Sequence, residues 1–172
     1  MSHRFTLVAA VATALFSTPL WAADPTDPQI AHIAYTAGQI DIAAAELALG
    51  KTENPEVRAF AELMKRDHTA VNEQALALVT KLGVTPEDND TSKALTAQAA
   101  ETAAKLEGLS DAAFDKAYVE NEVAYHQTVN GALKDVLIPA SKNAELKALL
   151  ETGLTLFSSH EEHAETLAGT LK

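Results

Sequence analysis

The chain has 172 residues, of which 24 are acidic and 13 are lysine or arginine, so its formal net charge at pH 7 is -11. A surface this acidic repels nucleic acid and anionic lipid, and neither is expected as a partner. The sequence contains no cysteine, which excludes disulfides, thiolate metal sites and a lipoprotein anchor. Abundant alanine, with only 7 glycines, favours helix over the whole length.

Residues 1–22, MSHRFTLVAAVATALFSTPLWA, have the pattern of a secretory signal peptide. Arg4 gives a positive start, an uncharged apolar run follows, and Pro19 precedes a small-residue site with cleavage expected after Ala22. The alternative, a retained membrane anchor, is disfavoured because the apolar run is shorter than the roughly 20 residues that span a bilayer. We therefore expect an exported, periplasmic protein that is soluble after cleavage and is not inserted stably in a membrane.

After cleavage, residues 23–172 have the length of a single domain. The first predicted helix spans about 28–50 with Asp27 as its N-cap, and the second spans about 55–82, between the N-cap Asn54 and Gly83. A short link joins them, so they should be antiparallel neighbours. The apolar residues that recur at helical spacing are Ile30, Ile33, Ala34, Ala37, Ile40, Ala44 and Leu47, then Val57, Phe60, Met64, Val71, Ala75, Leu78 and Leu82.

Three more helices are predicted, over about 91–107, 111–137 and 144–171. The first of them has thin apolar spacing, which favours a position across the bundle. The inward positions of the other two are Phe114, Tyr118, Glu122, Tyr125, His126, Val129, Leu133 and Val136, then Leu146, Leu149, Leu150, Leu156, Phe157, His160, Ala164 and Leu167. Two helical hairpins joined by a crossover segment give an all-α, up-and-down four-helix bundle with one additional shorter helix.

All four long helices carry a histidine or a carboxylate in or beside the apolar stripe. Asp41 borders the stripe of the first helix, His68 lies in that of the second, and His160 lies in that of the last. Glu122 and His126 are one turn apart on the helix between them and share a face. A rise of about 1.5 Å per residue, counted from the connecting turns, places these groups at mid-height. Burial costs each roughly 2 kcal/mol or more unless they satisfy one another or bind a metal.

Three interpretations of this layer remain open. The first is a transition-metal site with Asp41, His68, His126 and His160 as ligands and Glu122 as an alternate or supporting ligand; imidazole and carboxylate favour zinc or copper, and iron also accepts them. The second is a metal-free hydrogen-bond network that fixes helix register. In the third, these groups face solvent or a partner. No motif indicates an organic cofactor, and the oligomeric state stays open.

Other polar side chains near the layer are weaker candidates. His163, one turn after His160, and Asp67 are further possible ligands. His160 and His163 do not form the HExxH zinc signature, because that signature separates its histidines by one more position. Tyr118 and Tyr125 are placed to donate hydrogen bonds into the layer, although as core residues with aromatic rings they need no such role.

Several motifs resemble the DUF4142 family, an exported bacterial family of unknown function whose members are often labelled membrane or outer-membrane proteins. These motifs are D-P-x-I, G-x-I-D, N-P-x-V-x-x-F-A-x-x-M-x-x-D-H, G-L-S-x-x-x-F-D-x-x-Y-V, E-V-x-Y-H and S-S-H-x-x-H-A. The resemblance covers roughly 27–171, and its most specific parts are 64–68 and 114–118. It implies a ferritin-like bundle, with an acid at Asp41 and histidines at the three inward positions.

The resemblance implies a fold more than an activity. A ferritin-type di-iron site needs Glu-x-x-His on two helices, whereas Glu122 and His126 are separated by three residues. An oxidase or iron-storage role therefore does not carry over, and a di-iron oxidoreductase is only a third hypothesis. The first hypothesis is a non-catalytic or weakly catalytic metal-binding envelope protein, and the second is a structural or stress-related interaction protein with a metal-free layer.

Overall fold

The computed structural model describes residues 24–171, so the predicted signal peptide over 1–22 lies outside the described residues. In the described range the chain is helical and contains no strand, which confirms the all-α fold class. The helical elements are α1 (Asp27–Lys51), α2 (Pro55–Leu82), α3 (Asp90–Glu107), α4 (Asp111–Ala132), a stretch of π-helix η1 (Leu133–Leu137), α5 (Ile138–Ala140) and α6 (Ala144–Thr170). Within 24–171, no helix has the length and apolar character needed to cross a bilayer.

The helix ends follow from capping residues. Asn54 Oδ1 accepts hydrogen bonds from the backbone N–H groups of Glu56 and Val57 at 2.9 and 3.3 Å, which fixes the start of α2. Gly83 ends that helix in the left-handed conformation, with φ of 64°, as its lack of a Cβ allows. Asn143 caps α6 in the same way as Asn54 caps α2, and its Oδ1 lies 2.9 and 3.0 Å from the two N–H groups.

The predicted cap of α1 is wrong by one residue, because Thr26 is the N-cap and Asp27 is the first helical residue. The Asp27 carboxylate instead accepts hydrogen bonds from the backbone N–H groups of Lys142 and Asn143, both at 2.8 Å. It therefore ties the start of α1 to the turn between α5 and α6, a contact between residues more than a hundred positions apart that sequence spacing does not show.

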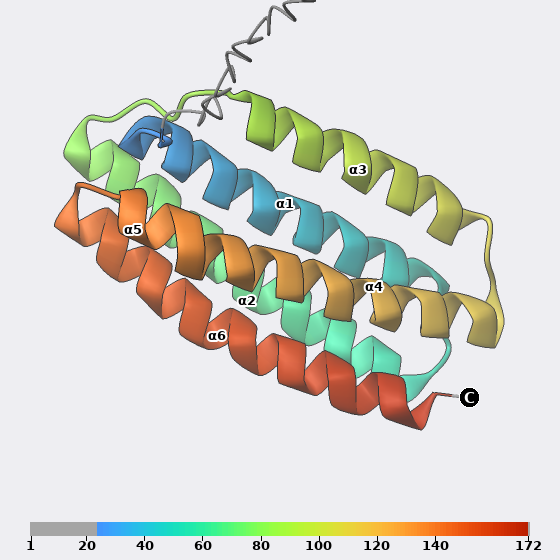
Figure 1. The fold of residues 1–172 in the computed structure, drawn as a ribbon. Coiled ribbons are helices and arrows are strands. Elements are labelled where there is room, and N and C mark those ends of the chain that lie inside the picture. The colour runs from blue at the N-terminus through green and yellow to red at the C-terminus, as the bar shows by residue number, and fades with distance from the viewer. Residues whose placement is uncertain (1–23, 172) are drawn as a thin grey trace, which may run out of the picture.

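The long helices form two antiparallel hairpins, α1 with α2 and α4 with α6 (Figure 1). The segment α3 runs beside α1 along the bundle rather than across it, and it returns the chain to the end where α4 begins (Figure 1). Leu106 joins one part of the core and Leu95 packs against another, so α3 is held near both ends. Because these two apolar contacts are spaced along one face of α3, they hold it along the bundle. The predicted position across the bundle is therefore wrong.

Two apolar clusters occupy the two halves of the bundle, with the polar residues between them along each long helix. The first cluster is built on Ala45, Ala48, Val57, Phe60, Ala61, Met64, Leu106, Phe114, Tyr118, Val119, Ala164 and Leu167. The second is built on Ile30, Ile33, Leu133, Leu137, Ala140, Leu146, Leu150 and Phe157. On α2, for example, Met64 belongs to the first cluster and Val71 packs against the second, with His68 between them.

The π-helical stretch η1 changes which side chains face inward at the end of α4. Val136 was predicted to face the core, but it is 46% exposed, and Leu137 is buried in its place. A π-helix adds residues to the turn, so the face of the helix that points inward moves along the sequence. The helical path then continues through α5 to Ala140, beyond the predicted stop near residue 137.

Candidate metal centre

The structure brings five of the predicted residues together from four helices. Asp41 comes from α1, His68 from α2, Glu122 and His126 from α4, and His160 from α6. All five are buried, with between 1% and 3% of each residue exposed. The helical spacing of the sequence predicts this convergence, since each residue lies between the parts of its helix that enter the two apolar clusters.

The three histidines form a compact group. His68, His126 and His160 each offer one ring nitrogen, and these nitrogens lie within 4.8 Å of one another. The ring centroids are separated by 5.3 to 5.6 Å. Phe157 stacks on the ring of His68 at 4.5 Å, with the two planes 9° apart, and so fixes its orientation. After small side-chain adjustments, three imidazoles in this arrangement can bind one ion with metal–nitrogen distances of about 2 Å.

Two carboxylates extend the group on one side. Ligand atoms of Asp41, Glu122 and His126 also lie within 4.8 Å of one another. Asp41 Oδ2 is 3.2 Å from His68 Nε2 and 3.6 Å from His126 Nε2. Glu122 Oε2 is 3.7 Å from His126 Nδ1. Asp41 therefore lies beside two of the three imidazoles, where it can act as a fourth donor.

Hydrogen bonds set the tautomers of two of the histidines. The Nδ1 atom of His126 lies 2.9 Å from the backbone carbonyl oxygen of Glu122, which can only accept, so Nδ1 carries the hydrogen. The Nε2 atom of His160 lies 3.1 Å from Asp67 Oδ2 and donates to that carboxylate. The lone pairs are thus left on Nε2 of His126 and on Nδ1 of His160. Metal-binding histidines usually donate their other N–H to a carbonyl or a carboxylate in this way.

Burial keeps the imidazoles neutral. It lowers the pKa of His68 from 6.5 to about 3, with a further decrease from the nearby His160 and an opposing effect of Asp67. Burial also lowers the pKa of His126, against the attraction of Asp41, and that of His160, against its hydrogen bond to Asp67. Neutral imidazole is the form that binds metals.

Burial shifts the pKa values of the two carboxyl groups in the opposite direction, upward. Burial raises the pKa of Glu122 well above its ordinary value, and the neighbouring charge of Asp41 raises it further. Burial also raises the pKa of Asp41, although His126 opposes this. Two carboxyl groups this close cannot both ionise readily, so the charge of one opposes ionisation of the other.

The unpartnered polar atoms of the layer fit a bound metal. Among the described residues, side-chain atoms that are buried without a hydrogen-bond partner include both oxygens of Asp41, both ring nitrogens of His68, Nε2 of His126 and Nδ1 of His160. Although His68 Nε2 and Asp41 Oδ2 are only 3.2 Å apart, their geometry does not make a hydrogen bond. Nitrogen and oxygen donors of this kind match the ligand preferences of zinc and copper.

Other predicted candidates lie outside this group. His163 is exposed, and its ring packs edge-on against Phe60 at 5.1 Å. Asp67 lies at the edge of the layer, where it binds His160 and receives a hydrogen bond from Arg66 at 2.7 Å. Tyr125 donates its hydroxyl hydrogen to the Ala37 carbonyl at 2.9 Å rather than into the layer.

A close approach of α1 and α2 beside the layer was not predicted. A Cβ at Gly38 would lie 2.4 Å from Asn72 Oδ1, so a larger residue there would have to displace the Asn72 side chain. The Asn72 Nδ2 atom donates to the Tyr35 carbonyl at 3.3 Å across the same interface. Gly38 and Asn72 lie one turn from Asp41 and His68, so this contact is next to the polar layer. A polar residue one turn after His68 on its inward face was the available signal.

The chain belongs to the DUF4142 family, described as a domain of unknown function, whose model matches residues 15–167. None of the curated proteins matches the chain. Two solved structures are similar in fold. CopM in its Cu(II)-bound form is 18% identical with a TM-score of 0.64, and the match covers 86% of this chain and 100% of that one. A DUF305 fragment from Deinococcus radiodurans is 17% identical with a TM-score of 0.67, over 86% and 99%.

Proposed function

We propose that this member of the DUF4142 family is a non-enzymatic envelope protein that binds one copper or zinc ion inside its helical bundle. His68, His126 and His160 supply the imidazole ligands, and Asp41 supplies a carboxylate. The observation that carries the proposal is the set of three buried imidazoles from three helices, with one nitrogen of each within 4.8 Å of the others. Iron is a further candidate, because it accepts the same ligands.

The hydrogen bonds around the imidazoles support the same function. Asp67 and the Glu122 carbonyl each hold one ring N–H, so that the opposite nitrogen of the ring offers its lone pair. The similar fold of CopM, whose structure is described as Cu(II)-bound, supports copper as the first ion to test. Such a site would sequester the ion from solution, since its ligands are 1–3% exposed.

The test is metal binding by matched histidine variants. Wild-type protein, stripped of metal and dialysed against Cu(II) or Zn(II), should retain one equivalent. A His68→Ala/His126→Ala double variant should retain none. A His32→Ala/His163→Ala double variant, which also loses two histidines but leaves the layer intact, should bind like the wild type. Equal metal content in the layer variant and the wild type would reject the proposal.

The supporting role of Asp67 gives a second measurement on the same site. Replacing it by asparagine removes the charge that holds the Nε2–H of His160 and leaves the ligating residues in place. Metal affinity should fall by about 10- to 100-fold while the stoichiometry stays at one. Unchanged affinity in Asp67→Asn would show that the charge of Asp67 does not support metal binding by His160.

The second candidate is a structural protein in which the layer fixes helix register without a metal. The bonds of His160 to Asp67 and of His126 to the Glu122 carbonyl favour it, because they already satisfy part of the layer. This function predicts that a chelator leaves the melting temperature of the isolated protein unchanged. A metal site predicts a clear decrease, because an ion bound only to the native state stabilises that state.

Export is part of the proposal and has its own test. The acidic surface and the signal-peptide pattern support an envelope location. Mass spectrometry of the protein from a periplasmic extract should give a mature chain that begins at residue 23. A full-length chain in the cytoplasmic fraction would contradict the location without affecting the metal site.

A further inference from the structure

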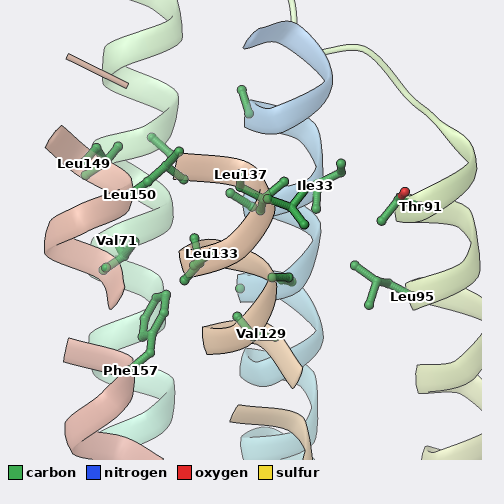
Figure 2. A pocket seen from close by; sticks show the side chains of 18 of the residues that line it. Ile33, Val71, Thr91, Leu95, Val129, Leu133, Leu137, Leu149, Leu150 and Phe157 are labelled. Carbon is green, nitrogen blue, oxygen red and sulfur yellow. The ribbon is translucent and has the colours of Figure 1, made fainter. Parts of the chain in front are cut away.

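A long apolar cavity of about 530 Å³ lies between the helices on one side of the polar layer. Its lining includes Ile33, Val71, Val129, Leu133, Leu150 and Phe157, which come from α1, α2, α4, η1 and α6 (Figure 2). The volume lies within the range of small-molecule sites in proteins. The cavity is therefore large enough to hold an organic ligand, and it is much larger than an ion or a few atoms would need.

The cavity reaches the polar layer at one end. Asp41, His68 and His126 line it together with the apolar residues. On α2 its lining extends from His68 to Val79, eleven residues along the chain, which corresponds to roughly 16 Å of helix axis. A ligand that fills it would have an elongated apolar body with one end against the imidazoles and Asp41.

The charges around the cavity exclude an anionic ligand. No lysine or arginine is among the described residues that line it, whereas the acidic residues Asp24 and Asp41 are. A carboxylate or phosphate head would thus meet no lysine or arginine and would lie beside Asp41.

At the end of the cavity beside the polar layer, the polar atoms without a hydrogen-bond partner are mainly acceptors. Tyr125 and Asn72 also line the cavity, but each donates to a backbone carbonyl. The oxygens of Asp41 and the Nε2 lone pair of His126 have no partner within the described residues, and both accept hydrogen bonds. A matching head group therefore supplies a hydrogen rather than a lone pair.

We propose that this cavity binds a neutral, elongated alcohol, with its hydrocarbon body among the apolar side chains and its hydroxyl hydrogen donated to Asp41 or to Nε2 of His126. The proposal goes beyond the metal site and concerns the metal-free protein, because a bound metal would use the same acceptor atoms. Its test is made on protein kept metal-free by a chelator, so that loss of metal binding and loss of alcohol binding are separate results.

The first measurement uses N-phenyl-1-naphthylamine, a neutral dye with one N–H donor that fluoresces in apolar surroundings. The wild type should bind about one dye molecule, and 1-decanol should displace it. Decanoate at neutral pH should displace the dye at least about tenfold less well, since its charge would be buried without a partner. No dye binding by the wild type, or equal displacement by decanol and decanoate, would overturn the proposal.

The second measurement fills the cavity. Ala34 and Ala75 line it and are half-buried, and replacing either by leucine places three carbons in the empty space. Ala34→Leu and Ala75→Leu should each weaken dye binding at least about tenfold, while Ala70→Leu, on the exposed face of α2, should leave it unchanged. Full dye binding by both filled variants would overturn the proposal. If a filled variant loses its helical circular dichroism, the decanol and decanoate comparison on the wild type still decides.

Discussion

Replacing His68 by glutamine should remove a part of the stability that depends on pH. His68 is 3% exposed, and burial lowers its pKa from 6.5 to about 3. Between these two values the unfolded chain holds a proton on this residue that the folded chain does not. The stabilisation linked to neutral His68 is therefore fully present above pH 6.5 and is lost as the pH falls toward 3.

The size of the effect follows from linkage. The full shift corresponds to roughly 5 kcal/mol, of which only the first part appears near neutral pH. Between about pH 7.5 and about pH 5.5, protonation of the unfolded chain should cost the wild type about 1.4 kcal/mol relative to His68→Gln. Glu122 acts in the opposite direction, because its raised pKa lets the folded state hold a proton that the unfolded state releases. The comparison of the two proteins cancels that contribution.

The assay is urea unfolding followed by circular dichroism at several pH values, with a chelator present so that no metal competes for the imidazoles. His32→Gln is the matched control, because it removes a histidine that hydrogen-bonds to Thr36 outside the layer. The free-energy difference between wild type and His68→Gln should decrease as the pH falls. A difference that stays constant or increases would refute a neutral, buried His68.

Three further predictions concern the metal, the helix contact and a cap. Cu(II) or Zn(II) at about 100 times its dissociation constant should stabilise the wild type by about 2.7 kcal/mol, measured by thermal melting. Gly38→Ala should destabilise by about 1–3 kcal/mol in urea melts because its Cβ meets Asn72, whereas Gly131→Ala, with nothing within 4 Å, should not. Asn54→Ala should cost about 1 kcal/mol in the same melts through loss of the α2 cap, and a cost near zero would refute that role.

The long helices and the depth of the layer could be predicted from the sequence because both follow from local rules. Caps such as Asn54 and Asn143 and the αL residue Gly83 mark the helix ends, and the positions between them have a helical period. A polar side chain inside an apolar stripe must face the interior. Counting residues from the turns then places His68 and His160 at similar depth.

Features that depend on contacts between distant residues could not be predicted in this way. The role of Asp67 as the partner of His160 depends on how α2 and α6 face each other, and adjacency to His68 gave no indication of it. The π-helical turn that exposes Val136 changes the helical period itself. The position of α3 beside α1 depends on two contacts, made by Leu95 and Leu106, that a weak apolar pattern leaves undetermined.

Counting hydrogens in the layer favours the metal site over a metal-free network. The Nδ1–H of His126 and the Nε2–H of His160 are already given to a carbonyl and to Asp67. His68 has the one remaining N–H of the three imidazoles, and neither of its ring nitrogens has a hydrogen-bond partner within the described residues. The acceptors left over are the other nitrogen of His68, Nε2 of His126, Nδ1 of His160 and the oxygens of Asp41. A buried group with more lone pairs than hydrogens is stabilised by an electron-pair acceptor, and a divalent cation at the centre of three imidazoles satisfies several of these atoms at once.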